Sequence, residues 1–342
     1  MSASAETLRT AVQHPAAGQL PLHERGSGVW PRTAGAEAML PSLPDGRPWP
    51  RITVVTPSFN QAGYLEDTIR SVLLQAYPNL EYFVVDGGSR DGSREIIEKY
   101  SPWIDDWVSE PDRGQSHAIN KGLARATGEV LAWLNSDDCY YPGALHTAAT
   151  LMASSDCDIL IGAMDKVVVS ADDVQVVKRS SPYQGLPLHP IRILRHGPRA
   201  DFHLIQPPMF WRSDLWRRTG GLDERYHFSM DTEWCNRALA LGARVDRTDE
   251  VLARFSLHPG AKTQAQYDRQ LRERALMYVR LSRLPEFRRL RCLAASVQPA
   301  RRALGVRARH SRGLHAAMLR AGGRALGAVD AGVHLVWRGL DR

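Results

Sequence analysis

Residues 52–92, ITVVTPSFNQAGYLEDTIRSVLLQAYPNLEYFVVDGGSRDG, decide the fold class. They begin with a short apolar, β-branched run at 52–56 that stops at a proline, as a buried strand does. Apolar side chains then recur at helical spacing over 62–76. A second apolar run at 81–85 leads into a dense turn signal at 86–92. The stretch therefore predicts strand, helix and strand, which is the building unit of a parallel sheet.

The same alternation continues to residue 138. Short helices are predicted at 93–100 and 116–126, and a third buried strand at 130–134. Together these segments predict an α/β domain with a mainly parallel central sheet flanked by helices. Ligands of such sheets bind at the carboxyl ends of the strands. Polar clusters follow all three predicted strands, at 56–60, 86–91 and 135–138, which indicates a binding site, although polar turns also end strands that have no function.

The chain divides into three parts by composition. Residues 1–50 are rich in Pro, Gly and Ala and are predicted to be a flexible N-terminal arm. Residues 51–262 form the predicted domain, and residues 263–342 a basic helical C-terminal extension. In the second half of the domain we expect short strands at 158–162, 166–169, 174–178 and 209–211. A long active-site loop is expected at 180–207 and a helix at 231–241. A short strand is expected just before His258, and a longer amphipathic helix at 264–284.

Composition excludes several classes of protein. Of 342 residues, 43% are hydrophobic and 24% charged, as in ordinary globular domains and unlike disordered chains. No run approaches the roughly 18 to 20 apolar residues that a membrane span needs. The four cysteines form no C-x-x-C pair, and the first residues show no basic region followed by an apolar core. A cytoplasmic protein with reduced thiols is therefore expected.

Positive charge is concentrated at the C-terminus. Residues 283–342 hold thirteen arginines and three acidic residues, so this segment more than accounts for the net charge of +7. Arginines interspersed with Leu, Val and Trp337 are compatible with peripheral contact to the inner face of the plasma membrane. A helical addition packed on the domain or partly disordered is the alternative. Nucleic acid is not an expected partner, because no known binding motif accompanies the charge.

Several carboxylates are candidates for chemistry. Asp137 and Asp138 are adjacent at a strand end, where two negative charges are tolerated if a hard cation or several donors neutralise them. A solvated turn is the alternative. Asp86 could accept from a base N–H or close a turn at the following glycines, and Asp91 is expected to cap the next helix. Asp231, in the first turn of a helix, could be a general base or a helix cap.

Taken together these segments resemble the family 2 glycosyltransferases, which have the GT-A fold, and most of all the bacterial branch that builds surface polysaccharides. The resemblance runs from about residue 51 to residue 262. It rests on TPSFNQ at 56–61, VDGGSRDG at 85–92, SEPDRGQS at 109–116, LNSDD at 134–138 and MDTEW at 230–234. No G-x-x-x-x-G-K-[ST] or G-x-G-x-x-G loop is present, so a nucleotide would bind by another scheme.

The resemblance implies a role for each matching residue. The nucleotide-sugar would be bound by Thr56, Pro57, Ser58, Asp86, Asp112, Arg113, Gly114 and Asp137. Asp138 would hold Mn²⁺ or Mg²⁺ with His258, and Asp231 would be the catalytic base. Glu233 would support the site and Gln206 would line the acceptor side. Asn135 departs from the aspartate found in many members, which places more of the metal binding on Asp138.

The implied reaction is a single displacement that inverts the anomeric carbon. A hexosyl group would pass from a nucleotide-diphosphate sugar, usually UDP-linked, to a hydroxyl of a glycan or polyprenyl-linked acceptor. Two alternatives differ in class. A nucleotidyltransferase would need a Gly-rich signature after the first strand, and this chain has none there. A non-catalytic GT-A binding module or partner subunit is disfavoured by the presence of Asp86, Asp138 and Asp231.

Overall fold

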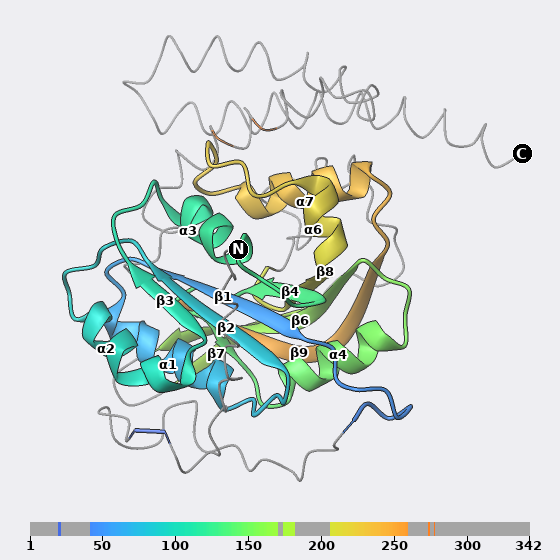
Figure 1. The fold of residues 1–342 in the computed structure, drawn as a ribbon, viewed down its shortest axis with the longest axis horizontal. Coiled ribbons are helices and arrows are strands. Elements are labelled where there is room, and N and C mark those ends of the chain that lie inside the picture. Colours follow the sequence, from blue (N-terminus) through green and yellow to red (C-terminus); the bar gives the residue numbers. More distant parts are fainter. Residues whose placement is uncertain are drawn as a thin grey trace, which may run out of the picture. The chain divides into compact units, whose positions relative to one another are not determined.

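The computed structural model describes residues 20–21, 42–169, 174–181 and 206–258, together with Glu273 and Met277. Helices and strands alternate along the first half of the described chain and strands dominate the second (Figure 1). In chain order they are β1 (Ile52–Ser58), α1 (Ala62–Leu73), β2 (Leu80–Asp86), α2 (Ser93–Tyr100), a 3-10 turn (Ser101–Trp103), β3 (Asp106–Ser109), α3 (Gln115–Leu123), β4 (Val130–Trp133), β5 (Cys139–Tyr140), α4 (Ala144–Ala153), β6 (Ile159–Val169), β7 (Val174–Ser180), β8 (Met209–Arg212), α6 (Ser213–Thr219), α7 (Met230–Ala240) and β9 (Val245–Leu257).

The strands of the described segments join one sheet in the order β3-β2-β1-β4-β8-β6-β9-β5, with β7 paired to β6. Strands β3, β2, β1 and β4 run parallel to one another. Strand β8 is antiparallel to both β4 and β6, and β9 is parallel to β6. The α/β class with a parallel centre, predicted from residues 52–134, is confirmed.

Helices cover both faces of the sheet. Helices α1, α2 and α4 lie on one side, and α3, α6 and α7 on the other (Figure 1). Strands β1 and β2 are therefore buried at every position, which explains why their sequences are apolar runs and do not alternate. Under α6 and α7, four tryptophans pack together with ring centroids 5.1 to 5.9 Å apart: Trp133, Trp211, Trp216 and Trp234.

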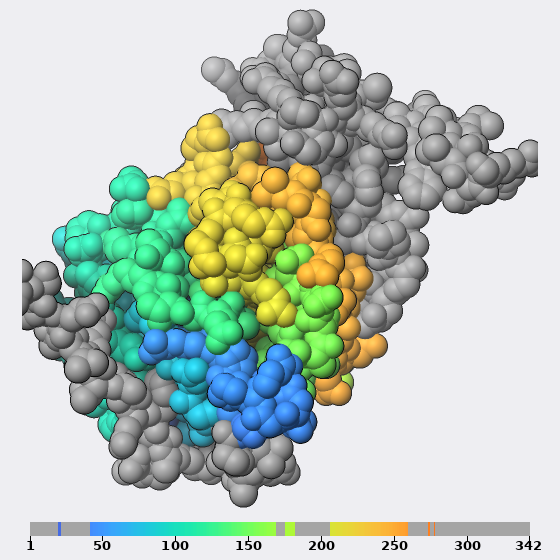
Figure 2. All heavy atoms as spheres, turned by 45° about the vertical axis from the view of Figure 1, so that its right-hand side comes forward, coloured from blue at the N-terminus to red at the C-terminus, as the bar shows by residue number. Residues whose placement is uncertain are grey.

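The packed domain begins earlier than the predicted boundary at residue 51. Trp49 is buried and makes edge-on ring contacts with Tyr77 and His146. The Arg47 guanidinium donates to the carbonyl of Ala153. The segment from residue 42, blue in Figure 2, thus lies against the body of the domain. Its proline and glycine content indicated an arm, but one buried tryptophan anchors it.

Two regions of the second half differ from prediction. The predicted strands at 158–162 and 166–169 are one bulged strand, β6, which pairs with β9 along most of its length. Strand β9 has thirteen residues, whereas only a short strand before His258 was expected. Its first half is rich in charged residues because that half is partly or fully exposed, and the buried positions, 252–254 and 256, all lie in the second half.

The chain divides into two compact units, Met1–Leu186 with His203–Ala265, and Pro187–Phe202 with Gln266–Arg342. The sheet and its helices belong to the first unit. Most of the predicted loop at 180–207, and the predicted extension from residue 263 apart from Glu273 and Met277, lie outside the described residues. The domain assignments there stay predictions. Among the described residues no helix is long and apolar enough to cross a bilayer.

The side chain of Asp91 connects the first residues of helices α1 and α2. Its Oδ1 accepts from the Ser93 amide at 3.1 Å and so caps the first amide of α2 from outside the helix, but the N-cap residue is Gly92 and not, as predicted, Asp91. Its Oδ2 accepts from the Ala62 amide at 2.9 Å, at the first residue of α1. Burial raises the pKa of Asp91, but the hydrogen bonds from Ser93 and Ala62 outweigh burial and hold that pKa below its ordinary value.

We expect Asp91→Ala to lower the free energy of unfolding by about 1–2 kcal/mol at pH 7, the usual effect of losing a helix-capping acceptor. Because the folded-state pKa is lowered, the stabilisation is present above the ordinary pKa and is lost as the pH falls through the lowered value. Urea unfolding at pH 7 and at pH 3 measures both effects. The exposed Asp156→Ala is the control, and an equal loss in the two variants at pH 7 would contradict the capping role.

Candidate active site

The site lies where the parallel strands end. Strands β1, β2 and β4 run in the same direction with β1 between the other two, so their carboxyl ends share one edge of the sheet. The chain connects β1 to β2 on one side, while β4 pairs with β1 on the other. That reversal is the point at which open α/β sheets bind ligands. The amide of Gly87 donates to the carbonyl of Ser58 at 2.8 Å, which joins the first two loops.

The end of β1 contributes mostly buried groups. Thr56, Pro57 and Ser58 are buried, and the Thr56 hydroxyl is hydrogen-bonded to the Tyr82 hydroxyl at 3.0 Å inside the domain. Thr56 can therefore line a nucleotide pocket only through its backbone. The Ser58 hydroxyl is buried without a hydrogen-bond partner. Phe59, the next residue, is 60% exposed, and its ring is the aromatic surface that this loop offers to a base.

Asp86, at the end of β2, organises the second loop. Its Oδ2 accepts from the amides of Gly88 and Ser89 and from the Ser109 hydroxyl, at 3.1, 2.8 and 2.7 Å. Its Oδ1 accepts from the Ser89 hydroxyl at 2.5 Å. The side chain is completely buried. The N–H of a base would have to share an oxygen of Asp86 with one of these donors or displace that donor. The predicted pairing of Asp86 with a base stays a prediction.

The third loop, with Asp112 and Gly114, approaches the first two at Gly87. A Cβ atom on Gly87 would lie 2.9 Å from Asp112 Oδ2 and 3.2 Å from the ring of Phe59. Glycine is therefore the residue that lets the three loops meet. Asp112 also accepts from the amide of Gly114 at 2.7 Å. Gly114 has a φ of 112°, which glycine adopts without strain.

Arg113 faces another loop and is largely exposed. Its guanidinium pairs with Glu224 at 2.7 and 2.8 Å. Burial raises the pKa of Glu224, while hydrogen bonds from Arg113 and Asn120 lower it, with a net shift below the ordinary value. The predicted role of Arg113 at the nucleotide would require this ion pair to open or to be shared with the ligand.

A chain of amides connects the third loop with the strand end of β4. Gln115 Nε2 donates to Asn135 Oδ1 at 2.7 Å. Asn135 Nδ2 donates to Asp138 Oδ2 and to Gln206 Oε1, both at 3.2 Å. Gln206 Nε2 in turn donates to the carbonyl of Trp133. Asn135 therefore both accepts and donates, and an ionised aspartate could not donate to Asp138. Gln206 is buried in this chain of amides, and its acceptor-side role stays a prediction.

The two adjacent aspartates point in different directions. Asp138 is completely buried, and its Oδ1 accepts from the amide of Ser256 at 3.1 Å. Burial and the neighbouring charge of Asp137 raise the pKa of Asp138 well above its ordinary value, although Arg254 opposes this shift. Asp137 is partly exposed, and its Oδ2 lies 3.1 Å from His258 Nε2.

His258 stands at the end of β9, brought to the aspartates because β5 pairs with β9. Its ring stacks on Tyr64, from the first turn of α1, with centroids 4.1 Å apart and an interplanar angle of 28°. The Nδ1 atom is buried without a hydrogen-bond partner. Nothing in the sequence pointed to Tyr64, because its contact depends on a strand that begins almost two hundred residues later.

The pair Asp137 and His258 fits a divalent cation. Ligands on adjacent corners of an octahedral ion stand about 3 Å apart, close to the 3.1 Å between these two atoms. Carboxylate and imidazole are ligands that Mn²⁺ accepts. Within the described residues no group of three or more His, Cys, Asp or Glu side chains could hold a metal. Further ligands would therefore come from a bound diphosphate or water.

Asp231 lies in the first turn of α7 and is partly exposed. Its Oδ1 accepts from the amide of Thr232 at 2.6 Å. Two residues further along the helix, Glu233 is buried and forms a two-bond ion pair with Arg237, at 2.8 and 2.9 Å. Both carboxylate oxygens of Glu233 are thus engaged by Arg237 of the same helix.

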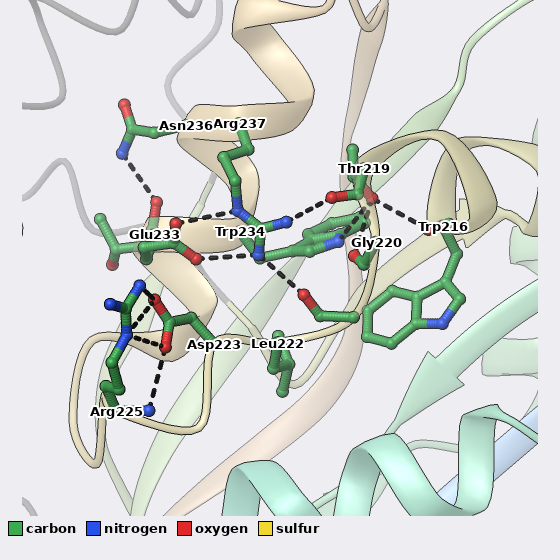
Figure 3. A network of polar contacts seen from close by, with 12 residues as sticks. Trp216, Thr219, Gly220, Leu222, Asp223, Arg225, Glu233, Trp234, Asn236 and Arg237 are labelled. Atoms are coloured by element: carbon green, nitrogen blue, oxygen red, sulfur yellow. Dashed lines mark hydrogen bonds and ion pairs between the residues drawn. The ribbon is translucent and has the colours of Figure 1, made fainter. Parts of the chain in front are cut away.

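Arg237 extends this contact to the loop that precedes α7 (Figure 3). It donates to the carbonyl of Gly221 at 2.8 Å and to that of Thr219. The indole N–H of Trp234 donates to the Thr219 hydroxyl at 2.9 Å. Glu233 thus orients an arginine that holds the loop, and its predicted supporting role in the site stays a prediction.

The comparisons with known proteins agree on the family. The family description Glycosyl transferase family 2 matches residues 53–214. The putative teichuronic acid biosynthesis glycosyltransferase TuaG of Bacillus subtilis is 38% identical over 112 residues, which cover 32% of this chain and 44% of TuaG. An uncharacterized glycosyltransferase of Nostoc is 33% identical over 135 residues, 38% of this chain and 41% of the relative. The matched region thus spans less than half the length of these two relatives.

Solved structures share the fold. S. aureus TarS 1–349 in complex with UDP-GlcNAc superposes with a TM-score of 0.58 at 19% identity, over 81% of this chain and 80% of TarS. The mannosyltransferase PcManGT of Pyrobaculum calidifontis, in complex with GDP-Man and Mn²⁺, gives a TM-score of 0.54 at 21% identity, over 83% and 75%. The sheet described above is therefore that of the GT-A glycosyltransferases.

Proposed function

Because the chain belongs to the family 2 glycosyltransferases, we propose that it transfers a sugar from a nucleotide-diphosphate donor to a hydroxyl of a glycan or polyprenyl-linked acceptor. A role in cell-surface polysaccharide synthesis is supported by the similarity to TuaG, a putative glycosyltransferase of teichuronic acid biosynthesis. The observation that carries the proposal is the meeting of three loops at Gly87, next to the strand end that presents Asp137 to His258.

The donor would lie along these loops, with its base at Phe59 and Asp86. An exposed aromatic ring can stack on a base, and the carboxylate of Asp86 stands one residue before the glycine turn. The solved structures that share the fold hold UDP-GlcNAc or GDP-Man, which supports a nucleoside diphosphate sugar as the donor. We propose UDP as the carrier, and a hexosyl group as the transferred sugar.

We propose that Asp137 and His258, in place of the predicted Asp138 and His258, hold the Mn²⁺ or Mg²⁺ ion. Asp137 is the carboxylate beside the imidazole, whereas the oxygens of Asp138 are engaged by Ser256 and Asn135. When bound, the ion would neutralise the charge that develops on the leaving diphosphate. Asp138 would then orient the turn that carries Asp137.

Asp231 is the proposed general base. Its carboxylate would take the proton of the acceptor hydroxyl while that oxygen attacks the anomeric carbon and the bond to the diphosphate breaks. Attack from the face opposite the leaving group inverts the carbon in one step. The partial exposure of Asp231 leaves it accessible to an acceptor.

Membrane contact through residues 283–342 also stays a proposal. These residues lie outside the described part of the chain, and the support is their arginine content alone. A polyprenyl-linked acceptor would suit an enzyme held at the inner face of the plasma membrane. Co-sedimentation with anionic liposomes at low salt tests the contact, and absence of binding would exclude it.

Thermal unfolding with UDP, GDP and dTDP, each with Mn²⁺ or with a chelator, tests the donor assignment. We expect UDP with Mn²⁺ to raise Tm most, since a ligand at 100 times its Kd stabilises the folded state by about 2.7 kcal/mol. The chelator arm is the control for metal dependence. A folded protein that responds to none of the nucleotides would contradict donor binding and favour a non-catalytic partner subunit.

A further inference from the structure

We infer that Asn120 is a positioning residue that fixes the loop leading to the helix of the proposed base, α7, to the helix that begins at the donor site, α3. Asn120 lies in the second turn of α3. Its Nδ2 donates to the carbonyl of Leu222 at 2.9 Å, and its Oδ1 accepts from the amide of Leu222 at 2.8 Å. One side chain thus satisfies both backbone groups of a residue 102 positions away, as a neighbouring strand would.

Asn120 lies so close to the loop that position 221 has no room for a side chain. A Cβ atom on Gly221 would lie 2.7 Å from Asn120 Oδ1, a separation that real Cβ atoms do not tolerate. Gly221 therefore has a steric function here, whereas the preceding Gly220 is needed for its positive φ of 72°. Asn120 Nδ2 also lies 3.4 Å from Glu224, which is the partner of Arg113.

The same loop is held from its other side by α7. Arg237 donates to the carbonyls of Thr219 and Gly221 (Figure 3). Residues 219–222 are thus bonded to α7 through Arg237 and to α3 through Asn120. Asp231 stands in the first turn of α7. These two side chains therefore contribute to the position of Asp231 relative to α3.

The beginning of α3 contacts the donor side. Gln115 donates to Asn135 next to the proposed metal pair, and the buried Ser116 hydroxyl donates to the carbonyl of Tyr226 at 2.9 Å. Gln115 and Asn120 are about 7 Å apart along the helix axis. Helix α3 is therefore a short rigid link between the end that would bind the diphosphate and the loop that would present the base.

The inference rests on the proposed function, and Asn120→Ala tests it. The assay is release of nucleotide from UDP-GlcNAc, with GDP-Man as the second donor, in the presence of Mn²⁺. We expect kcat to fall by about 10- to 100-fold, because displacements near 1 Å at a reacting group cost about that much. The KM for the donor should change less than twofold. Deuterium exchange of peptides covering 219–229 should become faster.

Asn79→Ala is the matched control. Asn79 also donates from its side chain to a distant backbone carbonyl, that of Trp49, but it stands before β2 at the opposite edge of the sheet. It should alter neither kcat nor exchange at 219–229. In Asn120→Asp the new carboxylate can accept from Leu222 but cannot donate, so an intermediate kcat is expected.

The possible failures can be told apart. A wild-type protein that releases no nucleotide from either donor would contradict the proposed function. An active wild type with an unchanged kcat in Asn120→Ala, or a KM that rises as much as kcat falls, would overturn the positioning role. Unchanged exchange at 219–229 would overturn it without any substrate.

Discussion

Asp231→Asn is expected to lower sugar transfer by at least 100-fold while nucleotide binding stays within twofold of wild type. A positioned general base contributes about 10²- to 10⁴-fold to rate, and an amide cannot take the proton of an acceptor hydroxyl. The substitution leaves the fold in place, because the side-chain oxygen of asparagine can still accept from the amide of Thr232. The loss should therefore fall on kcat.

Nucleotide release from the donor measures the rate, and the Tm shift with nucleotide and Mn²⁺ measures binding. Asp214→Asn is the matched control, since Asp214 also lies in a first helical turn, that of α6, and forms one long ion pair with Arg218. It should be as active as wild type. A loss of nucleotide binding as large as the loss of rate would show that Asp231 holds the donor and does not act as the base.

Asp137→Asn is expected to weaken Mn²⁺-dependent nucleotide binding by about 100-fold or more. Loss of groups that merely orient metal ligands costs about 10- to 100-fold, and loss of a ligating charge costs at least as much. The change should leave the free energy of unfolding nearly unaltered, because Asp137 is partly exposed and its contact is with His258. Titration of Mn²⁺ in the presence of UDP, followed by electron paramagnetic resonance, measures the affinity.

Asp138→Asn is the comparison that separates the two aspartates. Asp138 is buried and accepts from Ser256 and Asn135, so an amide nitrogen there would meet the donor of one of them. We expect a stability loss of about 1–3 kcal/mol from the unsatisfied group, seen in urea unfolding. If Asp138→Asn removed the Mn²⁺ dependence and Asp137→Asn did not, the metal ligand would be Asp138, as the resemblance implied.

Strands β1, β2 and β4 could be predicted because each is a largely apolar run, whereas the parallel strand β3, DWVS, is partly exposed and was not predicted. Strand β9 could not be predicted either, because its exposed first half has the composition of a loop. Strand β6 was divided at its centre, where Asp165 is buried in mid-strand and paired with Arg179 and Tyr141. A charged residue there resembles a strand end until the distant partner strand is known.

The sequence predicted which residues belong to the site, but only in part how their side chains contact one another. The turn after β4 was predicted to carry two diverging aspartates, but the amide of Ser256, 118 positions later, decides which one is buried. The same holds for Gln206, whose partners Asn135 and Trp133 lie more than 70 residues before it. Local patterns carry no information on such contacts, since they depend on the order of the strands.

The four packed tryptophans have an optical consequence. Trp133 precedes the strand end that carries Asp137, and Trp234 stands one helical turn after Asp231, with Trp211 in ring contact with both. Indole rings at this separation couple electronically and quench one another. Any shift of α7 against β4 during the reaction would therefore change the ultraviolet emission and circular dichroism of the native chain. The protein thus carries an unlabelled reporter of movement between the two sides of its own site.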